Sequence, residues 1–550
     1  MIVSSRFCER QVSRPIKSSV FWSGNKLLVD RLSDLLSACD VNDLLSGAGF
    51  ISDTIKDCPG SFGLIYEDDK KVVCMVDLSR SWPIFYAGQG ESFLVSDDGR
   101  ELAKEMGAND VDRNALIEFC SSGYVHGSKT LLDGVFQLES GNMLVFDKKT
   151  HKNNVVEYYR FYPDFPERDN SYDDNLAGLT ETLENVFDRL VDRLDGRKAV
   201  IPLSGGLDSK LILSMLVLRG YNNILTYSYG PKKSYEVNRA RALANQLGVP
   251  WQYIPFSRKK YYSGFRSPDR KKYWEFSDSL TSVPVMNDYF SLEFLLHEGL
   301  LSDDSVIING QTGDFISGGH IPLEFVYGRP SKDKFTQQVF SKHVALWKKG
   351  VTDNIQKHGV SLGDFGSIVC SFGEPENTVQ LCAEYEMWEW KERQSKLVVN
   401  GQRAYEFFGL SWELPFWDPE LVMFFEKVPY QYRYDQSLFR DCLKVNNYLG
   451  LFENPVSENR RWPGMTRYLS LGALIIEKLL SIEKTAFSKY LSYFGHYSDQ
   501  YVFYGFRDFI RVVGKAHVPP QARGVIALGV DRWIHENLTS RDGITALKNI

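Results

Sequence analysis

The sequence has few features that would place the protein in a membrane or outside the cell. Its eight cysteines are scattered, with no C-x-x-C pair, which argues against a zinc site and a disulfide framework. The segment after Met1 has no apolar core like that of a signal peptide. The longest apolar tract near the end, 469–480, contains Glu477 and Lys478 and is too short to span a bilayer. We therefore expect a cytoplasmic protein with no membrane span.

An excess of positive charge is also absent. The 550 residues carry a formal net charge of −6, which gives no case for binding nucleic acid. The contents of 43% hydrophobic and 24% charged residues are ordinary for a soluble globular protein. A chain of this length is too long for one core, so we expect two or more domains.

One short stretch carries most of the functional information. An apolar run at 199–203 ends in Ser204-Gly205-Gly206-Leu207-Asp208-Ser209, and a helical pattern follows at once. The glycines let backbone N–H groups approach an anion, and the helix directs its free N–H groups and positive dipole end at the same point. Because Asp208 lies among donors that attract phosphate, it needs a cation there, and Mg²⁺ shared with a pyrophosphate meets this need. The chain has no G-x-x-x-x-G-K-[ST] motif, so the stretch is not a Walker loop.

Hydrophobic patterns divide the chain into three parts. Residues 1–165 are expected to form a strand-rich α+β domain, with a hairpin at 62–66 and 71–76. In 175–445, strands alternate with helices, which predicts a doubly wound parallel sheet with its ligand site at the carboxyl ends of the strands. The chain from about 330, including the extension 446–550, is expected to be mainly helical. The other predicted segments are the linker 162–170, the strands 199–203, 224–229, 251–254 and 306–308, and the helices 176–193, 210–219, 234–247 and 287–299.

Three stretches in order along the chain resemble the asparagine synthetase family. Ser204 to Ser209 looks like the PP-loop of enzymes that cleave ATP to AMP and pyrophosphate. Ile308 to Asp314 is similar to the family's Ser-Gly-Glu-Gly-Ser-Asp-Glu segment, and Ser411 to Val422 is similar to its E-x-R-x-P-F-L-D-x-x-L-V stretch. In the first domain, stretches that resemble the family's glutamine amidotransferase (Ntn-type) domain lie at 77–86, 123–127 and 130–135.

The resemblance implies roles for individual residues. Asp208 and Asp314 would bind Mg²⁺ on the pyrophosphate of ATP, in agreement with the oxygen ligands that a hard cation prefers. The other residues implied in ATP binding are Ser204, Gly205, Gly206 and Ser209, which would cradle the pyrophosphate, Leu207 in the same loop, and Leu203, Tyr229, Asn309 and Gly310, which would line the adenosine pocket.

The first domain departs from the family pattern where the family carries its nucleophile. The family's glutaminase half needs a cysteine at position 2, and this chain has Ile2, which cannot be a nucleophile. We do not expect processing to expose Cys8, and the family's glutamine-holding N-G-E segment is not visible in 1–60. We therefore expect a glutaminase-like scaffold without glutaminase activity. The nitrogen would be ammonia from solution or from a partner subunit, or an amine already on the substrate.

The second domain departs at two positions of the site. Gln311 stands where the family has a glutamate, and Gln436 stands where it has a lysine that neutralises charge as pyrophosphate leaves. Nearby cations that could replace this lysine are Arg433, Arg440 and Lys444. The candidate catalytic residues are Asp208, Asp314, Gln311 and Arg440.

Two further features have more than one interpretation. His320 follows Asp314 closely and could act as a base or cap a turn. The basic stretch 258–273 could clamp an anionic substrate, but we expect it to be a solvated loop.

The sequence as a whole predicts an ATP- and Mg²⁺-dependent ligase. It would adenylate the carboxylate of a small-molecule substrate and transfer ammonia or an amine to it. The variant 310–320 looks more like family members associated with bacterial surface-polysaccharide synthesis, which makes a sugar acid the expected acceptor. The alternatives are an intramolecular cyclase of the β-lactam synthetase or lasso-peptide cyclase type, and a non-catalytic ATP-binding scaffold subunit. A homodimer is a further expectation that the sequence leaves open.

Overall fold

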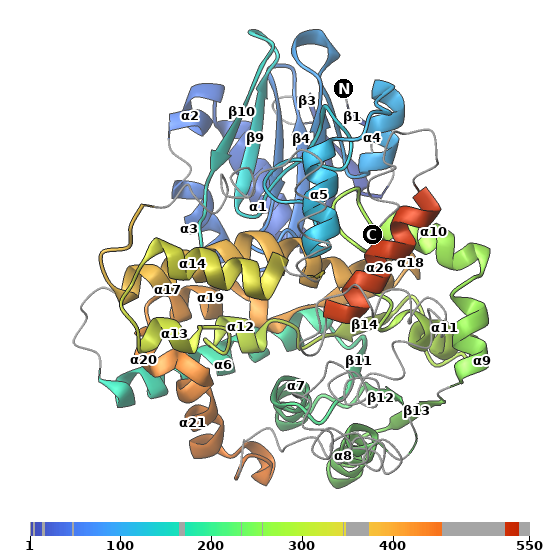
Figure 1. The fold of residues 1–550 in the computed structure, drawn as a ribbon, viewed down its shortest axis with the longest axis vertical. Helices are drawn as coiled ribbons and strands as arrows, with labels where there is room; N and C mark the ends of the chain where they lie inside the picture. The colour runs from blue at the N-terminus through green and yellow to red at the C-terminus, as the bar shows by residue number, and fades with distance from the viewer. Residues whose placement is uncertain are drawn as a thin grey trace, which may run out of the picture.

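The computed structural model describes three parts of the chain. These are residues 2–347, 373–453 and 523–537, except for 4–5, 14–16, 47–48, 164–170, 231, 233, 256 and 345. The predicted linker at 162–170 falls mostly outside the described residues. In Figure 1 the N-terminal strands lie at the top, and the helices and parallel strands of the later chain lie below them.

The N-terminal part contains two sheets that enclose an apolar layer. Alternate residues of the central hairpin face opposite sides, as a pleated strand requires. Ile65, Val72 and Cys74 contact the smaller sheet, whereas Leu64 and Val73 belong to the cluster on the other side. The predicted hairpin is confirmed. The six-stranded sheet has the order β10 (Lys152–Glu157), β9 (Asn142–Asp147), β5 (Lys71–Val76), β4 (Phe62–Glu67), β3 (Lys17–Gly24) and β2 (Cys8–Ser13). The four-stranded sheet has the order β1 (Ile2–Val3), β7 (Leu94–Ser96), β6 (Phe85–Ala87) and β8 (Val135–Gln137).

The second part is built on a five-stranded sheet whose strand pairs are all parallel. The strand order is β13 (Trp251–Pro255), β12 (Ile224–Gly230), β11 (Lys198–Pro202), β14 (Ser305–Ile308) and β15 (Ser411–Glu413). After β11, the next two strands of the chain lie on one side of it and β14 lies on its other side. The loops after β11 and β14 therefore meet at a topological switch point. The parallel sheet is therefore as predicted, except that β15 was not expected in a region predicted to be mainly helical.

Helices connect and cover this sheet. The predicted helices at 176–193, 210–219, 234–247 and 287–299 are confirmed, with ends shifted by a few residues. They are α6 (Tyr172–Leu194), α7 (Leu207–Leu218), α8 (Tyr235–Gln246) and α11 (Tyr289–His297). Later helices that border the site are α12 (Gly313–Ile316), α14 (Lys332–Val339), α17 (Thr378–Glu389), α18 (Arg403–Phe407), α20 (Tyr430–Arg433) and α21 (Ser437–Asn446).

The basic stretch 258–273 is not a loop, so that expectation was wrong. It forms α9 (Arg258–Gly264) and the start of α10 (Pro268–Ser277), each with a serine N-cap. Arg270 is fully buried, and its guanidinium binds both carboxylate oxygens of Glu536 at 2.6 Å. The long-range carboxylate explains why a basic residue is buried in a segment that looks solvated.

Of the extension 446–550, the structure describes 446–453 and the helix α26 (Arg523–Asn537). This helix lies beside α5 (Arg113–Ser122) and α10 (Figure 1), where the Trp533 and Phe119 ring centroids are 4.8 Å apart. Trp533 Nε1 also donates to Asp278 Oδ2 at 2.9 Å. In the ranges that the structure describes, every helix is too short or too polar to cross a bilayer.

Candidate active site

The loop between β11 and α7 has the geometry predicted from its sequence. Gly206 is the N-cap of α7 and makes no side-chain cap hydrogen bond. The two serine hydroxyls shape the loop, since Ser204 Oγ lies 3.1 Å from Ser209 Oγ and accepts from the Gly206 N–H at 3.1 Å. The start of the helix therefore has no capping side chain, as an anion site requires.

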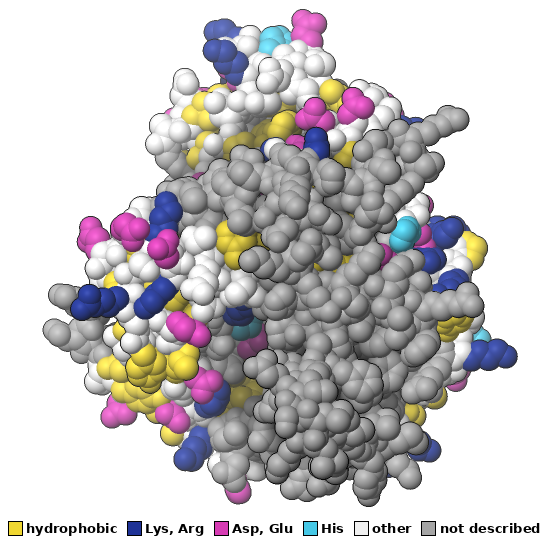
Figure 2. Space-filling view, in the orientation of Figure 1, with side chains coloured by type: hydrophobic (Ala, Val, Ile, Leu, Met, Phe, Trp, Pro, Cys, Tyr) yellow, Lys and Arg dark blue, Asp and Glu magenta, His cyan; other side chains and the backbone are white. Residues whose placement is uncertain are grey.

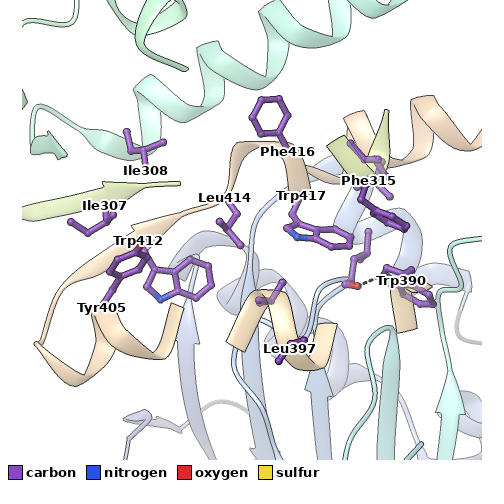
Figure 3. Packing of buried hydrophobic residues seen from close by; sticks show 14 of the residues in the cluster. Ile307, Ile308, Phe315, Trp390, Leu397, Tyr405, Trp412, Leu414, Phe416 and Trp417 are labelled. Atoms are coloured by element: carbon purple, nitrogen blue, oxygen red, sulfur yellow. Dashed lines mark hydrogen bonds between the residues drawn. The ribbon is translucent and has the colours of Figure 1, made fainter. Parts of the chain in front are cut away.

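The loop after β14 packs directly against this first loop. A Cβ added to Gly313 would lie 2.5 Å from Asp208 Oδ1, and one added to Gly310 would lie 2.9 Å from Asp208 Cβ. Only glycine allows such a close approach. The sheet thus brings Asp208 and Asp314 together, although they are far apart in the sequence. Figure 3 shows that Phe315, the next residue, points into the apolar cluster near Trp417 and Trp390, which holds α12 in place.

The two aspartates have opposite electrostatic environments. Desolvation and the negative charge of Asp314 raise the pKa of Asp208 well above its ordinary value. Desolvation also disfavours the charged form of Asp314, but the hydrogen bond and positive charge of His320 outweigh it and lower the pKa of that carboxyl. Asp208 Oδ1 is buried and has no hydrogen-bond partner among the described residues. A buried carboxylate oxygen without a donor is costly, and a bound cation would satisfy it.

These two carboxylates fit a magnesium ion better than a metal held by protein ligands alone. Among the residues that the structure describes, no group of three or more His, Cys, Asp or Glu side chains is arranged to hold a metal. Mg²⁺ typically takes one or two carboxylates and completes its coordination with phosphate oxygens and water. Asp208 and Asp314 are therefore the residues that would hold the ion.

His320 lies between Asp314 and a fully buried glutamate. Its Nε2 is 3.2 Å from Asp314 Oδ2, and its Nδ1 is 2.6 Å from Glu389 Oε1. Desolvation disfavours the charged imidazole of His320. The negative charge of Glu389 and the hydrogen bonds of the imidazole to Asp314 and Glu389 outweigh this effect and raise the pKa of His320 to about 9. At neutral pH the ring is therefore a cation that binds Asp314, which does not fit a role as a base.

The residues expected at the adenosine side are held by a hydrogen-bond network. Asn309 Nδ2 donates to Tyr405 Oη at 2.7 Å, and this hydroxyl donates to Asp288 Oδ2 at 2.6 Å. Tyr229 also hydrogen-bonds to Asp288, whose pKa is raised by burial. Leu203 and Gly310 lie in the same two loops, at the ends of β11 and β14. Neither Asp288 nor Tyr405 belongs to a local motif, so sequence patterns do not identify them.

The candidate catalytic residue Gln311 is oriented by its neighbours. Its side-chain oxygen accepts a hydrogen bond from Gln402 Nε2, and its backbone N–H donates to Asn309 Oδ1 at 2.9 Å. An amide in this position can donate and accept hydrogen bonds but cannot take a proton as a carboxylate would.

The predicted substitutes for the missing lysine are not equally placed. Arg433, one of the three alternatives, is fully buried and binds Glu386 at 2.7 and 2.9 Å, so it is not available to a ligand. Arg440 pairs with Asp435 at 2.8 and 3.0 Å, and in the part of the chain that is described no hydrogen bond or ion pair joins it to either loop. Gln436 does border the site, because its Nε2 donates to Ser317 Oγ at 2.8 Å.

The fold and the two loops define an α/β domain of the PP-loop type. Residues 182–445, just under half of the chain, match the family model for asparagine synthase. The resemblance found in the sequence is thus confirmed for the second domain. Families of this type use ATP, usually with Mg²⁺.

Curated relatives match a short part of the chain. The chain is 39% identical over 69 residues to 7-cyano-7-deazaguanine synthase of Polynucleobacter asymbioticus, which is 12% of this chain and 28% of that protein. It is 39% identical over 57 residues to the protein of the same name from Thermoplasma acidophilum, which is 10% of this chain and 24% of the relative. The chain therefore spans about a quarter of the length of these relatives.

Solved structures show weaker likeness. NH3-dependent NAD synthetase from Campylobacter jejuni has 11% identity and a TM-score of 0.20, over 38% of this chain and 93% of that one. Glutamine phosphoribosylpyrophosphate amidotransferase from B. subtilis has 9% identity and a TM-score of 0.18, over 55% and 63% of the two chains. TM-scores this low do not establish a shared fold.

Replacing Gly313 with alanine is expected to lower the rate of pyrophosphate release from Mg-ATP by at least about 10-fold. The new Cβ would lie 2.5 Å from Asp208 Oδ1, and displacing a reacting group by about 1 Å can cost about 100-fold in rate. The measurement is steady-state pyrophosphate release, with thermal unfolding recorded in parallel. Gly49→Ala is the matched control, because nothing lies within 4 Å of its added Cβ. Equal rates for Gly313→Ala and the wild type would contradict the close packing of the two loops.

Proposed function

We propose that the chain is an ATP-dependent ligase that forms an amide bond by adenylating a carboxylate. The observation that carries this proposal is the position of Asp208 in the first turn of α7, with the α12 residue Asp314 near it. There the partnerless Asp208 oxygen and the uncapped helix N–H groups provide for a cation and a phosphate together. The asparagine synthase family match over 182–445 supports the same chemistry.

The proposed reaction has two steps. An oxygen of the acceptor carboxylate attacks the α-phosphorus of ATP, and the bond to the bridging oxygen breaks, which gives an acyl-adenylate and pyrophosphate. The nitrogen of ammonia or an amine then attacks the acyl carbon, AMP leaves, and one proton is released. Adenylation is needed because a free carboxylate is a poor electrophile and AMP is a better leaving group than oxide.

Each loop has a defined part in this proposal. The N–H groups at the start of α7 and the Ser204 hydroxyl would bind the pyrophosphate oxygens. Asp208 and Asp314 would hold Mg²⁺, which supplies positive charge to the phosphate oxygens when it is bound. Asn309, held by Tyr405, would keep the second loop in register against the nucleotide.

The nitrogen source and acceptor are proposed from the resemblance. Ile2 belongs to β1, which pairs with β7, and its side chain packs against the apolar cluster between the sheets. An apolar residue there supports an N-terminal scaffold that does not hydrolyse glutamine. We propose a sugar acid as the acceptor and ammonia from solution or a partner subunit as the nucleophile. A cytoplasmic location and a homodimer remain predictions.

The test is pyrophosphate release from Mg-ATP across a panel of sugar acids, aspartate and peptide carboxylates, with and without ammonium. Release that needs both one acceptor and ammonium supports the amide ligase. Release without ammonium consumption favours an intramolecular cyclase. Binding of ATP without release for any acceptor contradicts the ligase and favours a scaffold subunit.

A further inference from the structure

A cluster of cations surrounds Glu389, close to Asp314. Glu389 is fully buried at the end of α17. His320 Nδ1, Arg393 Nη1 and Lys342 Nζ lie 2.6, 3.3 and 3.7 Å from its carboxylate oxygens. One carboxylate thus faces a guanidinium, an ammonium and an imidazole, and this imidazole is also shared with Asp314. Arg393 and Lys342 therefore bring a guanidinium and an ammonium to this side of the site.

Two of these cations keep unused hydrogen-bond donors. A guanidinium has five N–H groups and an ammonium has three. Among the described residues, Arg393 uses one donor, at 3.3 Å to Glu389, and Lys342 uses one, at 3.3 Å to the His320 carbonyl oxygen. Their side chains are 25% and 34% exposed. Both can therefore reach a ligand without leaving the cluster.

The backbone around both cations is irregular. Lys342 lies in the π-helical segment η2 (Phe340–Val344), and Arg393 lies in the π-helical segment η3 (Trp390–Val398). π-Helical turns are rare and occur frequently at functional sites. In Figure 2, histidine, basic and acidic side chains lie together near the middle of this face, over α12.

The cluster is within electrostatic reach of the proposed metal site. His320 Nε2 lies 3.2 Å from Asp314 Oδ2 and His320 Nδ1 lies 2.6 Å from Glu389 Oε1, so one imidazole joins Asp314 to the carboxylate that Arg393 contacts. Asp208 lies on the other side of the second loop, against Gly313. On the side of His320, Asp314 is thus connected to Arg393 and Lys342 through Glu389, by contacts of 2.6 to 3.7 Å.

We propose that Arg393 and Lys342 form a second anion subsite beside Asp314, which binds an oxyanion of the reactants. Guanidinium groups recognise carboxylates and phosphates by paired hydrogen bonds, and a lysine adds a point charge. The oxyanion is a phosphate of the nucleotide or the carboxylate of the acceptor. The identity of these two sources rests on the proposed function.

The experiment compares the wild type with Arg393→Gln and Lys342→Gln in the full chain. Calorimetry measures the dissociation constant of inorganic pyrophosphate in the presence of Mg²⁺. Pyrophosphate release, with glucuronate among the acceptors, measures the KM of the acceptor. We expect Arg393→Gln to raise either the dissociation constant of pyrophosphate or the KM of the acceptor by about 10- to 100-fold. This is the range for the loss of a hydrogen bond to a charged group. Arg160→Gln is the control, because Arg160 is 56% exposed and pairs with its neighbour Glu157.

The outcomes distinguish a nucleotide phosphate from the acceptor carboxylate as the bound oxyanion. Weaker pyrophosphate binding assigns the subsite to the nucleotide, and a raised KM with unchanged pyrophosphate binding assigns it to the acceptor. The subsite is overturned if Arg393→Gln leaves pyrophosphate binding unchanged and also leaves the KM unchanged. It is likewise overturned if pyrophosphate binding is unchanged and there is no turnover from which to measure a KM. Wild-type protein that binds pyrophosphate through Arg393 but turns over no acceptor contradicts the proposed function and leaves the subsite standing.

Because Arg393 also contacts buried Glu389, a conservative variant keeps the test decisive. Arg393→Lys preserves the charge beside Glu389 and removes the paired donors. If the glutamine variant does not fold, a change of threefold or more in either constant for Arg393→Lys supports the subsite. No change in the lysine variant overturns it.

Discussion

Replacing Asp208 with alanine is expected to lower the rate of pyrophosphate release by about 100- to 1000-fold, as found when one charge-stabilising group is removed from an active site. Asp208 and Asp314 are the two carboxylates that would hold Mg²⁺, and a single carboxylate would bind the ion far more weakly. Pyrophosphate release at saturating Mg-ATP measures the effect. The midpoint temperature of thermal unfolding is not expected to fall, because the lost oxygen Oδ1 has no hydrogen-bond partner among the described residues.

Two variants serve as controls for this prediction. Asp208→Asn keeps the shape of the side chain but removes its charge, and we expect it to be as inactive as the alanine variant. Asp188→Ala removes an exposed carboxylate of α6 that pairs with Arg219, and its rate should equal that of the wild type. A fully active Asp208→Asn variant would be incompatible with a charged metal ligand at this position.

Replacing Glu386 with alanine is expected to lower the free energy of unfolding by about 3–5 kcal/mol, the usual cost of leaving a buried charge without its partner. Both side chains of the Arg433–Glu386 pair are at most 1% exposed, and both terminal nitrogens of Arg433 bind the carboxylate. The pair also supports the site, because a Cβ added to Gly318 would lie 2.6 Å from the Arg433 carbonyl oxygen. Equilibrium unfolding in urea measures the loss.

An exposed ion pair provides the comparison. Asp53 and Lys56 are 71% and 52% exposed and 3.2 Å apart, so Asp53→Ala should cost less than about 1 kcal/mol. The double change Glu386→Leu with Arg433→Met should recover much of the lost stability, because it leaves no buried charge. A loss below about 1 kcal/mol for Glu386→Ala would show that Arg433 finds another partner.

The sequence predicted the elements that local patterns control. The apolar run, the two glycines and the helical pattern after Ser209 together specified a strand, a turn and a helix N-terminus, and the structure has all three. The predicted parallel sheet also appears, because alternating strands and helices leave few other arrangements. The order of the family motifs predicted an asparagine synthetase-like domain at 175–445, and the family model for asparagine synthase matches 182–445.

The errors came from contacts between distant residues. The basic stretch looked solvated because its partner Glu536 lies 266 positions away from Arg270. Arg433 looked available because Glu386, which binds it, is 47 positions away and in no recognised motif. β15 was not expected, since its pairing partner among the described residues is β14, about a hundred residues earlier.

The sequence by itself determined the loop and the parallel sheet, because backbone propensity and hydrophobic period act over a few residues. The pair of aspartates was implied by the resemblance to the asparagine synthetase family. Only the tertiary structure decided which groups meet Asp314. His320 is charged because Glu389 and Asp314 both bind it, and Arg393 lies near them because α17 continues into a π-helical segment there. Charge and hydrogen bonding act across space, so the electrostatics of the site depend on packing rather than on order along the chain.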